Sequence, residues 1–179
     1  MLNINYSRIE IDFDFYSKYH SHYLNKIVHI IFIPLICFSL FIFLNYIPLS
    51  LDIYTTSFNI FNFRPSFILY LLYMIYYCYN SISIGLFCIV FYFIILLASN
   101  LFYYNIEYSY VYAIIFQIIS WIAQIASHKY IEGNSPAFKD GFIQSFLTAP
   151  MFIVVEILEI ITKKIWIRRI INTEYSSIS

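Results

Sequence analysis

Charged side chains are scarce in this chain, and their scarcity excludes most classes of soluble protein. Asp, Glu, Lys and Arg make up 11% of the 179 residues, against about 25% in a typical globular protein. Hydrophobic residues make up 61%, and the mean hydropathy is +0.75. The formal net charge is zero, so the chain lacks the basic surface that neutralises the phosphates of nucleic acids. We therefore expect a polytopic membrane protein whose partner is the lipid bilayer, with no nucleic acid.

Cysteine chemistry is also missing. The three cysteines, Cys37, Cys78 and Cys88, lie in apolar segments and form no CxxC pair. Neither a disulfide framework nor a structural zinc site is therefore indicated. The N-terminal segment carries acidic side chains instead of the apolar core of a signal peptide. We expect membrane insertion to rely on the first spanning helix.

Apolar runs long enough to cross a bilayer dominate the rest of the chain. A helix of about 20 residues is about 30 Å long and matches the hydrocarbon core. We predict four spanning helices, at residues 26–46, 66–79, 83–103 and 109–127, of which the second is short. Pro34 lies inside the first helix and is expected to kink it or to leave a carbonyl for another partner.

The C-terminal part departs from this pattern. Residues 142–161 are apolar, but Pro150 interrupts the run, and Glu156 and Glu159 lie in its second half. Charged groups at depth are costly unless they are paired. We expect a re-entrant or interfacial segment there, or a fifth crossing. The basic residues within 163–169 alternate with isoleucine and tryptophan, and they predict an amphipathic helix on a cytoplasmic surface.

These elements predict an all-α fold, a polytopic membrane helical bundle in a single domain. Residues 1–25 are expected to form an N-terminal interfacial segment, residues 26–162 the bundle and residues 163–179 a basic C-terminal tail. Basic residues near both ends place both termini on the cytoplasmic side under the positive-inside rule. That placement requires an even number of crossings and favours four, whereas a fifth crossing would put the termini on opposite sides.

Histidine is confined to two short islands. His20, His22 and His29 lie in HSHYLNKIVH, and His128 lies in WIAQIASHKYIEGNSPA. Four crossings return the chain to its starting side, so the islands can meet at one membrane face; three would leave them about 30 Å apart. Imidazole binds iron, copper and zinc, and three histidines leave open positions for substrate or oxygen. The sequence is equally compatible with an interfacial belt of histidines and tyrosines.

Other polar side chains accompany the histidines. Gln124, His128 and Glu132 recur every four residues and share one helical face if the helix continues through them. Asn25 precedes an apolar run and suits a helix N-cap. In a metal site, Glu132, Gln124 and Asn25 would be further ligands or outer-shell groups that orient the imidazole rings.

The two histidine islands lie in longer blocks, HSHYLNKIVHIIFIPL and WIAQIASHKYIEGNSPAF, the second followed by FLTAPMFIVVEIL. These blocks resemble the two signature blocks of the fungal-type 2-hydroxy fatty acid dioxygenase family. The resemblance covers residues 16–34 and 121–156 and departs from the family pattern at Ser127, His22 and Tyr23. The matching positions are His20, Asn25, His29, Pro34, Trp121, Gln124, His128, Glu132, Pro136, Ala137 and Pro150.

The resemblance implies an enzyme of fatty acid α-oxidation in the endoplasmic reticulum membrane, acting in lipid and sphingoid-base catabolism. Such an enzyme would use Fe(II) and dioxygen to shorten a 2-hydroxy fatty acid by one carbon. It further implies that His20, His29 and His128 hold the iron. Glu132 would be a fourth ligand or a proton carrier, and His22 an extra ligand or a spectator.

A second class of function fits the composition, namely a non-catalytic lipid-binding or membrane scaffold protein with interfacial histidines. Membrane desaturases and hydroxylases also use histidines, but their HxxxH and HxxHH boxes need many more than the four in this chain. Bound iron and oxygen-dependent loss of 2-hydroxypalmitate would distinguish the enzyme from the scaffold.

Overall fold

Helices account for all the regular structure in the part of the chain that the computed structural model describes, residues 8–48, 64–133 and 138–162. The predicted all-α fold is therefore confirmed. The predicted basic tail lies outside the described residues. The elements in chain order are α1 (Arg8–Tyr19), α2 (Tyr23–Asn45), α3 (Pro65–Asn80), α4 (Ile82–Asn105), α5 (Ser109–Ser127), the π-helix η2 (His128–Glu132) and α6 (Phe138–Thr162).

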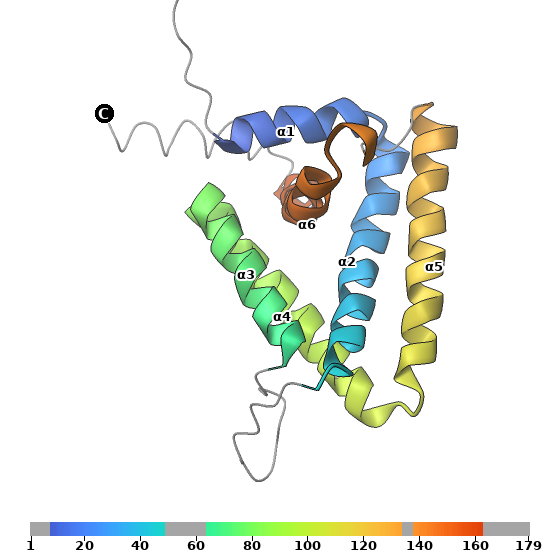
Figure 1. The fold of residues 1–179 in the computed structure, drawn as a ribbon. Helices are drawn as coiled ribbons and strands as arrows, with labels where there is room; N and C mark the ends of the chain where they lie inside the picture. The colour runs from blue at the N-terminus through green and yellow to red at the C-terminus, as the bar shows by residue number, and fades with distance from the viewer. Residues whose placement is uncertain (1–7, 49–63, 134–137, 163–179) are drawn as a thin grey trace, which may run out of the picture.

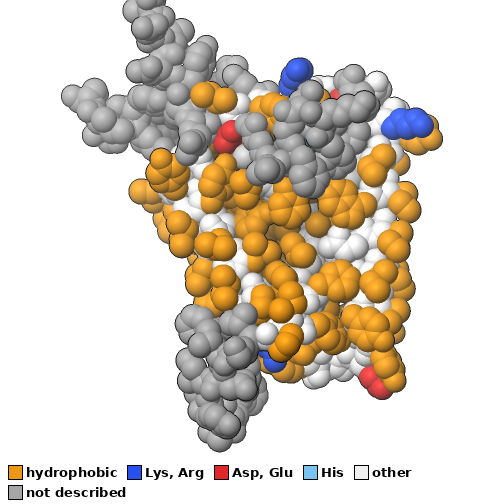
Figure 2. Space-filling view, viewed as in Figure 1, with side chains coloured by type: hydrophobic (Ala, Val, Ile, Leu, Met, Phe, Trp, Pro, Cys, Tyr) orange, Lys and Arg blue, Asp and Glu red, His pale blue; other side chains and the backbone are white. Residues whose placement is uncertain are grey.

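Three helices among the described residues are long and apolar enough to cross a membrane. They are α2, α4 and the continuous helix Ser109–Glu132, which α5 and η2 form together. α3 has 16 residues, about 24 Å at 1.5 Å per residue, and is shorter than these spans. Figure 2 shows hydrophobic side chains over the flank of the bundle, with the visible charged side chains toward its two ends. The chain thus has the build of a multi-pass membrane protein, while the count of four crossings stays a prediction.

The spanning helices bring distant parts of the chain to one end of the bundle. α2 and α5 lie side by side and run in opposite directions (Figure 1), so the start of α2 meets the end of α5. α1 lies across this same end. α3 and α4 form a close hairpin, which Gly85 permits because a Cβ there would lie only 2.7 Å from the Cα of Cys78.

α6 runs in a different direction from the spanning helices. Figure 1 views it along its axis, beneath α1 and between α2 and the α3–α4 hairpin. The helix continues through Pro150, where the sequence predicts a break. Proline deprives the carbonyl four residues earlier of its helical partner, and the Tyr73 hydroxyl donates to that carbonyl, the one of Phe146, at 3.3 Å. α6 therefore remains one helix on both sides of Pro150, and it lies transversely to the spanning helices.

Candidate metal centre

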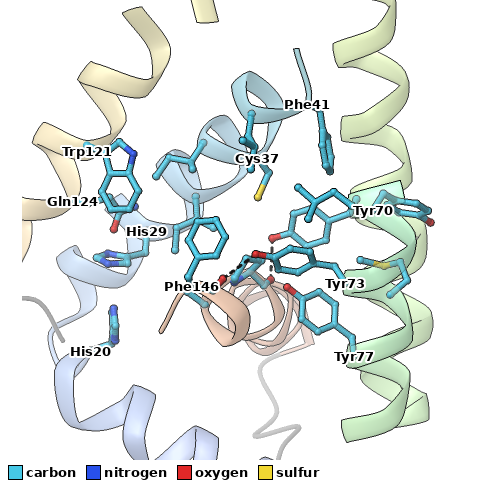
Figure 3. Close-up of a pocket in the computed structure, with 18 of the residues that line it drawn as sticks. His20, His29, Cys37, Phe41, Tyr70, Tyr73, Tyr77, Trp121, Gln124 and Phe146 are labelled. Carbon is cyan, nitrogen blue, oxygen red and sulfur yellow. Dashed lines mark hydrogen bonds between the residues drawn. The ribbon is translucent and has the colours of Figure 1, made fainter. Parts of the chain in front are cut away.

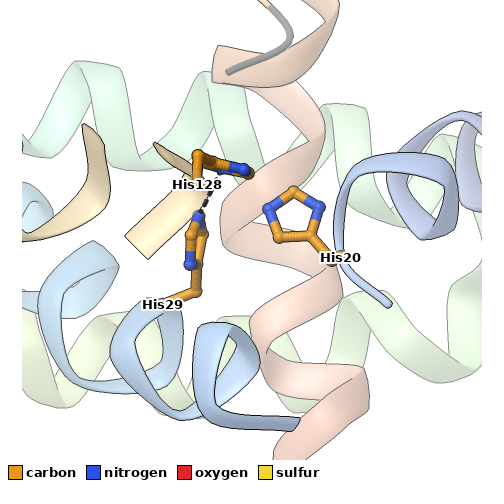
Figure 4. Close-up of side chains that lie close together, drawn as sticks. All are labelled: His20, His29 and His128. Atoms are coloured by element: carbon orange, nitrogen blue, oxygen red, sulfur yellow. Dashed lines mark hydrogen bonds between the residues drawn. The ribbon is translucent and has the colours of Figure 1, made fainter. Parts of the chain in front are cut away.

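Three buried histidines from distant parts of the chain lie close together (Figure 4). His20 lies between α1 and α2, His29 lies in α2, and His128 is the first residue of η2. Their ring centroids are 4.4 Å (His20–His29), 4.8 Å (His29–His128) and 4.9 Å (His20–His128) apart. Each ring offers one nitrogen, and these nitrogens lie within 4.8 Å of one another. The two histidine islands therefore meet, and these three residues can hold a metal ion.

Backbone carbonyls orient two of the three rings. The Nδ1 of His20 lies 2.8 Å from the carbonyl oxygen of Tyr16, and the Nδ1 of His29 lies 2.9 Å from that of Asn25. A carbonyl only accepts, so each Nδ1 must carry the proton and donate it, which leaves the lone pair of Nε2 available to a metal. This carbonyl support is typical of histidine ligands.

The distance between two of the rings also fits a metal. The Nε2 atoms of His29 and His128 are 3.1 Å apart. Two nitrogens that bind one ion at about 2.1 Å, with an angle of about 90–109° between them, lie about 3.0–3.4 Å apart. The pair is therefore already at a separation that coordination requires.

Burial keeps His20 neutral. The transfer of its ring out of water is the main cause that lowers the pKa to about 3, and His128 and Lys26 lower it further, while the bond to the Tyr16 carbonyl opposes the shift. The ring of Tyr16 also stacks on His20, with centroids 4.0 Å apart and an interplanar angle of 9°. At neutral pH the His20 imidazole is therefore uncharged, as a metal ligand must be.

Glu132 joins the two segments that carry the histidines. Its carboxylate accepts hydrogen bonds from the Ser21 hydroxyl at 2.7 Å, the His22 backbone N–H at 2.8 Å and the Asn25 side-chain amide at 3.0 Å. Among the described residues, the cluster of possible ligand atoms contains the three imidazoles and no carboxylate. Through these hydrogen bonds, Glu132 links η2 to the start of α2 and the residues just before it.

The other three predicted site residues occupy different positions. His22 is exposed and caps α2, since its Nδ1 accepts from the Leu24 backbone N–H at 3.2 Å. Asn25 is fully buried and supports His29 through its backbone carbonyl. Gln124 is also buried and lines the same cavity as the three histidines. The structure therefore brings Asn25 and Gln124 to the histidine cluster and leaves His22 outside it.

An apolar cavity of about 120 Å³ opens from the histidines into the bundle (Figure 3). Helices α2, α3, α4, α5 and α6 all contribute to its wall, while the histidines lie at one side of it. Such a cavity suits a ligand with a polar head and a long apolar tail. Its wall residues include Ile33, Cys37, Phe41, Tyr73, Tyr77, Trp121, Gln124 and Phe146.

Two residues beside the site, Tyr16 and Lys26, were missed by the sequence analysis. Tyr16, which stacks on His20, lies four residues before it, and that helical spacing was a usable signal. Lys26 pairs with the buried Glu156, with 2.8 Å between Nζ and Oε1. The free-energy cost predicted for burying the charge of Glu156 is thus offset by this ion pair. Nothing in the sequence connects Glu156 to a lysine so far away along the chain.

Comparison with known proteins agrees with this geometry. A family profile described as "2-hydroxy-palmitic acid dioxygenase Mpo1-like" matches residues 6–161, which include every histidine and Glu132. The Saccharomyces cerevisiae protein "2-hydroxy-palmitic acid dioxygenase MPO1" is 30% identical over 144 residues, which cover 80% of this chain and 76% of the yeast protein. No solved structure matches the chain.

Proposed function

Since the chain belongs to the Mpo1-like family of 2-hydroxy-palmitic acid dioxygenases, we propose that it is an Fe(II)-dependent dioxygenase that shortens 2-hydroxy fatty acids by one carbon. The observation that carries this proposal is the cluster of three buried histidines at the side of an apolar cavity. Interfacial histidines of a scaffold protein would instead face the headgroups and water.

His20, His29 and His128 would hold the iron, and three neutral imidazoles fit it as donors. When bound, iron supplies open coordination positions for dioxygen and for the oxygen atoms of the substrate head. The carbonyls of Tyr16 and Asn25 hold two of the rings in the ligating orientation. The reaction cleaves the bond between C1 and C2 of the substrate. A 2-hydroxy acid and dioxygen together have the composition of the shortened acid, carbon dioxide and water, so the balance needs no added reductant.

The cavity would receive the acyl tail, while the head reaches the histidines. This arrangement lets a membrane-dissolved substrate react without leaving the lipid, and it agrees with the location of the cluster where the start of α2 meets the end of α5. We propose an endoplasmic reticulum membrane location with both termini cytoplasmic, a role in fatty acid and sphingoid-base catabolism, and one membrane domain over residues 1–179.

Glu132 is part of the proposed site as a proton carrier or a fourth ligand. Its three hydrogen bonds support a third role, in which it holds the histidine-bearing segments together. These bonds use three of the about four lone-pair sites of its carboxylate, so at most one site is left for a substrate proton or a metal ion.

Metal analysis and turnover test the proposal together. We expect the protein, purified in detergent and reconstituted with Fe(II), to hold one iron and to consume 2-hydroxypalmitate only when oxygen is present. His128→Ala should bind iron at least about tenfold more weakly and lose turnover, because one of three ligands is gone. A chelator should lower the unfolding temperature of the wild type by more than that of His128→Ala. Iron binding and normal turnover by His128→Ala would refute the site assignment.

A further inference from the structure

Most polar side chains in the cavity wall already have partners in the protein. The hydroxyls of Tyr70, Tyr73 and Tyr92 donate to the carbonyls of Ile89, Phe146 and Pro150. The Trp121 indole N–H donates to the side-chain oxygen of Gln117 at 2.9 Å. The three tyrosine bonds join different helices and the tryptophan bond lies within α5, so none of these donors is free to receive the polar head of a substrate.

Gln124 differs from them. Its side chain is 6% exposed and lines the cavity with all three histidines. Its amide nitrogen is buried and has no hydrogen-bond partner among the described residues. Figure 3 shows the side chain beside Trp121 and His29. A buried amide without a partner costs free energy, so this position is explained best by a ligand that satisfies it.

The contrast with Gln117 strengthens this argument. Gln117 lies two turns earlier on the same face of α5, and both ends of its amide are used: its nitrogen donates to the Ile36 carbonyl at 3.1 Å and its oxygen accepts from Trp121. A glutamine in this helix can therefore find partners within the protein. Gln124 lies two turns closer to the end of α5, and its amide nitrogen has no such partner among the described residues.

We propose that Gln124 recognises the α-hydroxy acid head of the substrate, with its amide N–H donating to the carboxylate and its amide oxygen accepting from the 2-hydroxyl. This inference rests on the proposed function and names a specificity-determining residue for it. A carboxylate only accepts, whereas a hydroxyl also donates. Only a 2-hydroxy acid therefore satisfies both ends of the amide, and an unsubstituted fatty acid leaves the Gln124 oxygen without a donor.

Tyr77 provides the matched control. Its hydroxyl is also buried without a hydrogen-bond partner among the described residues and belongs to the same cavity wall. It lies on α3, across the cavity from His20 and His29 (Figure 3). Tyr77→Phe removes one unpartnered hydroxyl from the cavity wall. It leaves unchanged the residues beside the histidines, where the polar head of the substrate would bind.

The experiment compares the dissociation constants of 2-hydroxypalmitate and palmitate, measured by isothermal titration calorimetry without oxygen. The proteins are iron-loaded wild type, Gln124→Leu and Tyr77→Phe. Palmitate should bind more weakly to the wild type. Gln124→Leu should reduce this preference about tenfold, because the hydroxyl loses its acceptor. Tyr77→Phe should keep the wild-type preference. Gln124→Leu should also retain its iron and unfold at the same or a higher temperature, since it removes an unpartnered group.

An unchanged preference in Gln124→Leu would overturn the inference. Loss of iron would do the same, because it would assign Gln124 to the metal, and so would failure to fold, because it would show that the amide has a structural partner. The binding preference is measured without turnover. A wild type that discriminates between the two acids but consumes neither would therefore contradict the proposed function and leave the role of Gln124 intact.

Discussion

At the scale of single residues, Glu132 connects the two parts of the proposed centre. The donors that reach it, from Ser21, His22 and Asn25, lie in the short segment between His20 and His29. A carboxylate can accept all three bonds because its two oxygens carry about four lone-pair sites. An amide has one acceptor oxygen and would turn its own N–H groups toward some of these donors. The charge state and shape of this one side chain therefore determine how firmly His20 and His128 are held together.

Glu132→Gln is expected to weaken iron binding about tenfold, as loss of an outer-shell partner does at other metal sites. Ser21→Ala, which removes one of the three donors, should have a smaller effect in the same direction. Iron titration of both variants and of the wild type measures this. If Glu132 is instead a proton carrier, Glu132→Gln will bind iron normally and lose kcat, and a positioning role is then wrong.

The residues that the sequence analysis identified correctly as neighbours share a simple property. The four histidines of this chain lie in two short segments, the crossing count placed both segments on one membrane face, and the family resemblance implied that His20, His29 and His128 act together. What they contact was not predictable. The pairing of Lys26 with Glu156 and the bonds from Ser21 to Glu132 join segments at opposite ends of the chain, and no local pattern encodes such contacts.

At the scale of elements, the limits of the predicted spans agree with α2, α3, α4 and α5 to within three residues, because polar residues and turns bound the apolar runs. The π-helix η2 was not predicted. The spacing of His128 and Glu132 fits an α-helix as well as a π-helix. The wider π-helical turn becomes favourable only through contacts such as those of Glu132 with the start of α2. π-turns are rare and often lie at functional sites.

The α3–α4 hairpin gives a prediction at this scale. In Gly85→Ala, the added Cβ would lie 2.6 Å from the Sγ and 2.7 Å from the Cα of Cys78, and backbone atoms cannot move aside as a side-chain tip can. We expect a loss of about 2 kcal/mol in stability, measured as a lower thermal unfolding temperature in detergent. Ile82→Ala, at an exposed position of the same helix, is the control and should change little. An unchanged unfolding temperature in Gly85→Ala would show that the helices are less closely packed.

At the scale of the whole molecule, the proposed site exists only because two antiparallel helices bring their ends together. His29 lies near the start of α2 and His128 near the end of the helix Ser109–Glu132. An even number of crossings from α2 to that helix puts both on one side of the membrane. Helix lengths identify three spans among the described residues, so the short helix α3 must act as the remaining crossing if the histidines share a face in the bilayer.

Cysteine accessibility in sealed membranes tests this topology. Tyr23 and Tyr130, which flank the histidine cluster, and Tyr108, in the turn between α4 and α5, are all exposed. An impermeant maleimide should label Tyr23→Cys and Tyr130→Cys from the cytoplasmic side and Tyr108→Cys only after the membrane is opened. The unmodified chain is the blank, since its cysteines are at least partly buried. Labelling of Tyr23→Cys and Tyr130→Cys from opposite sides would separate His29 from His128 by the bilayer, and a shared metal ion would then be impossible.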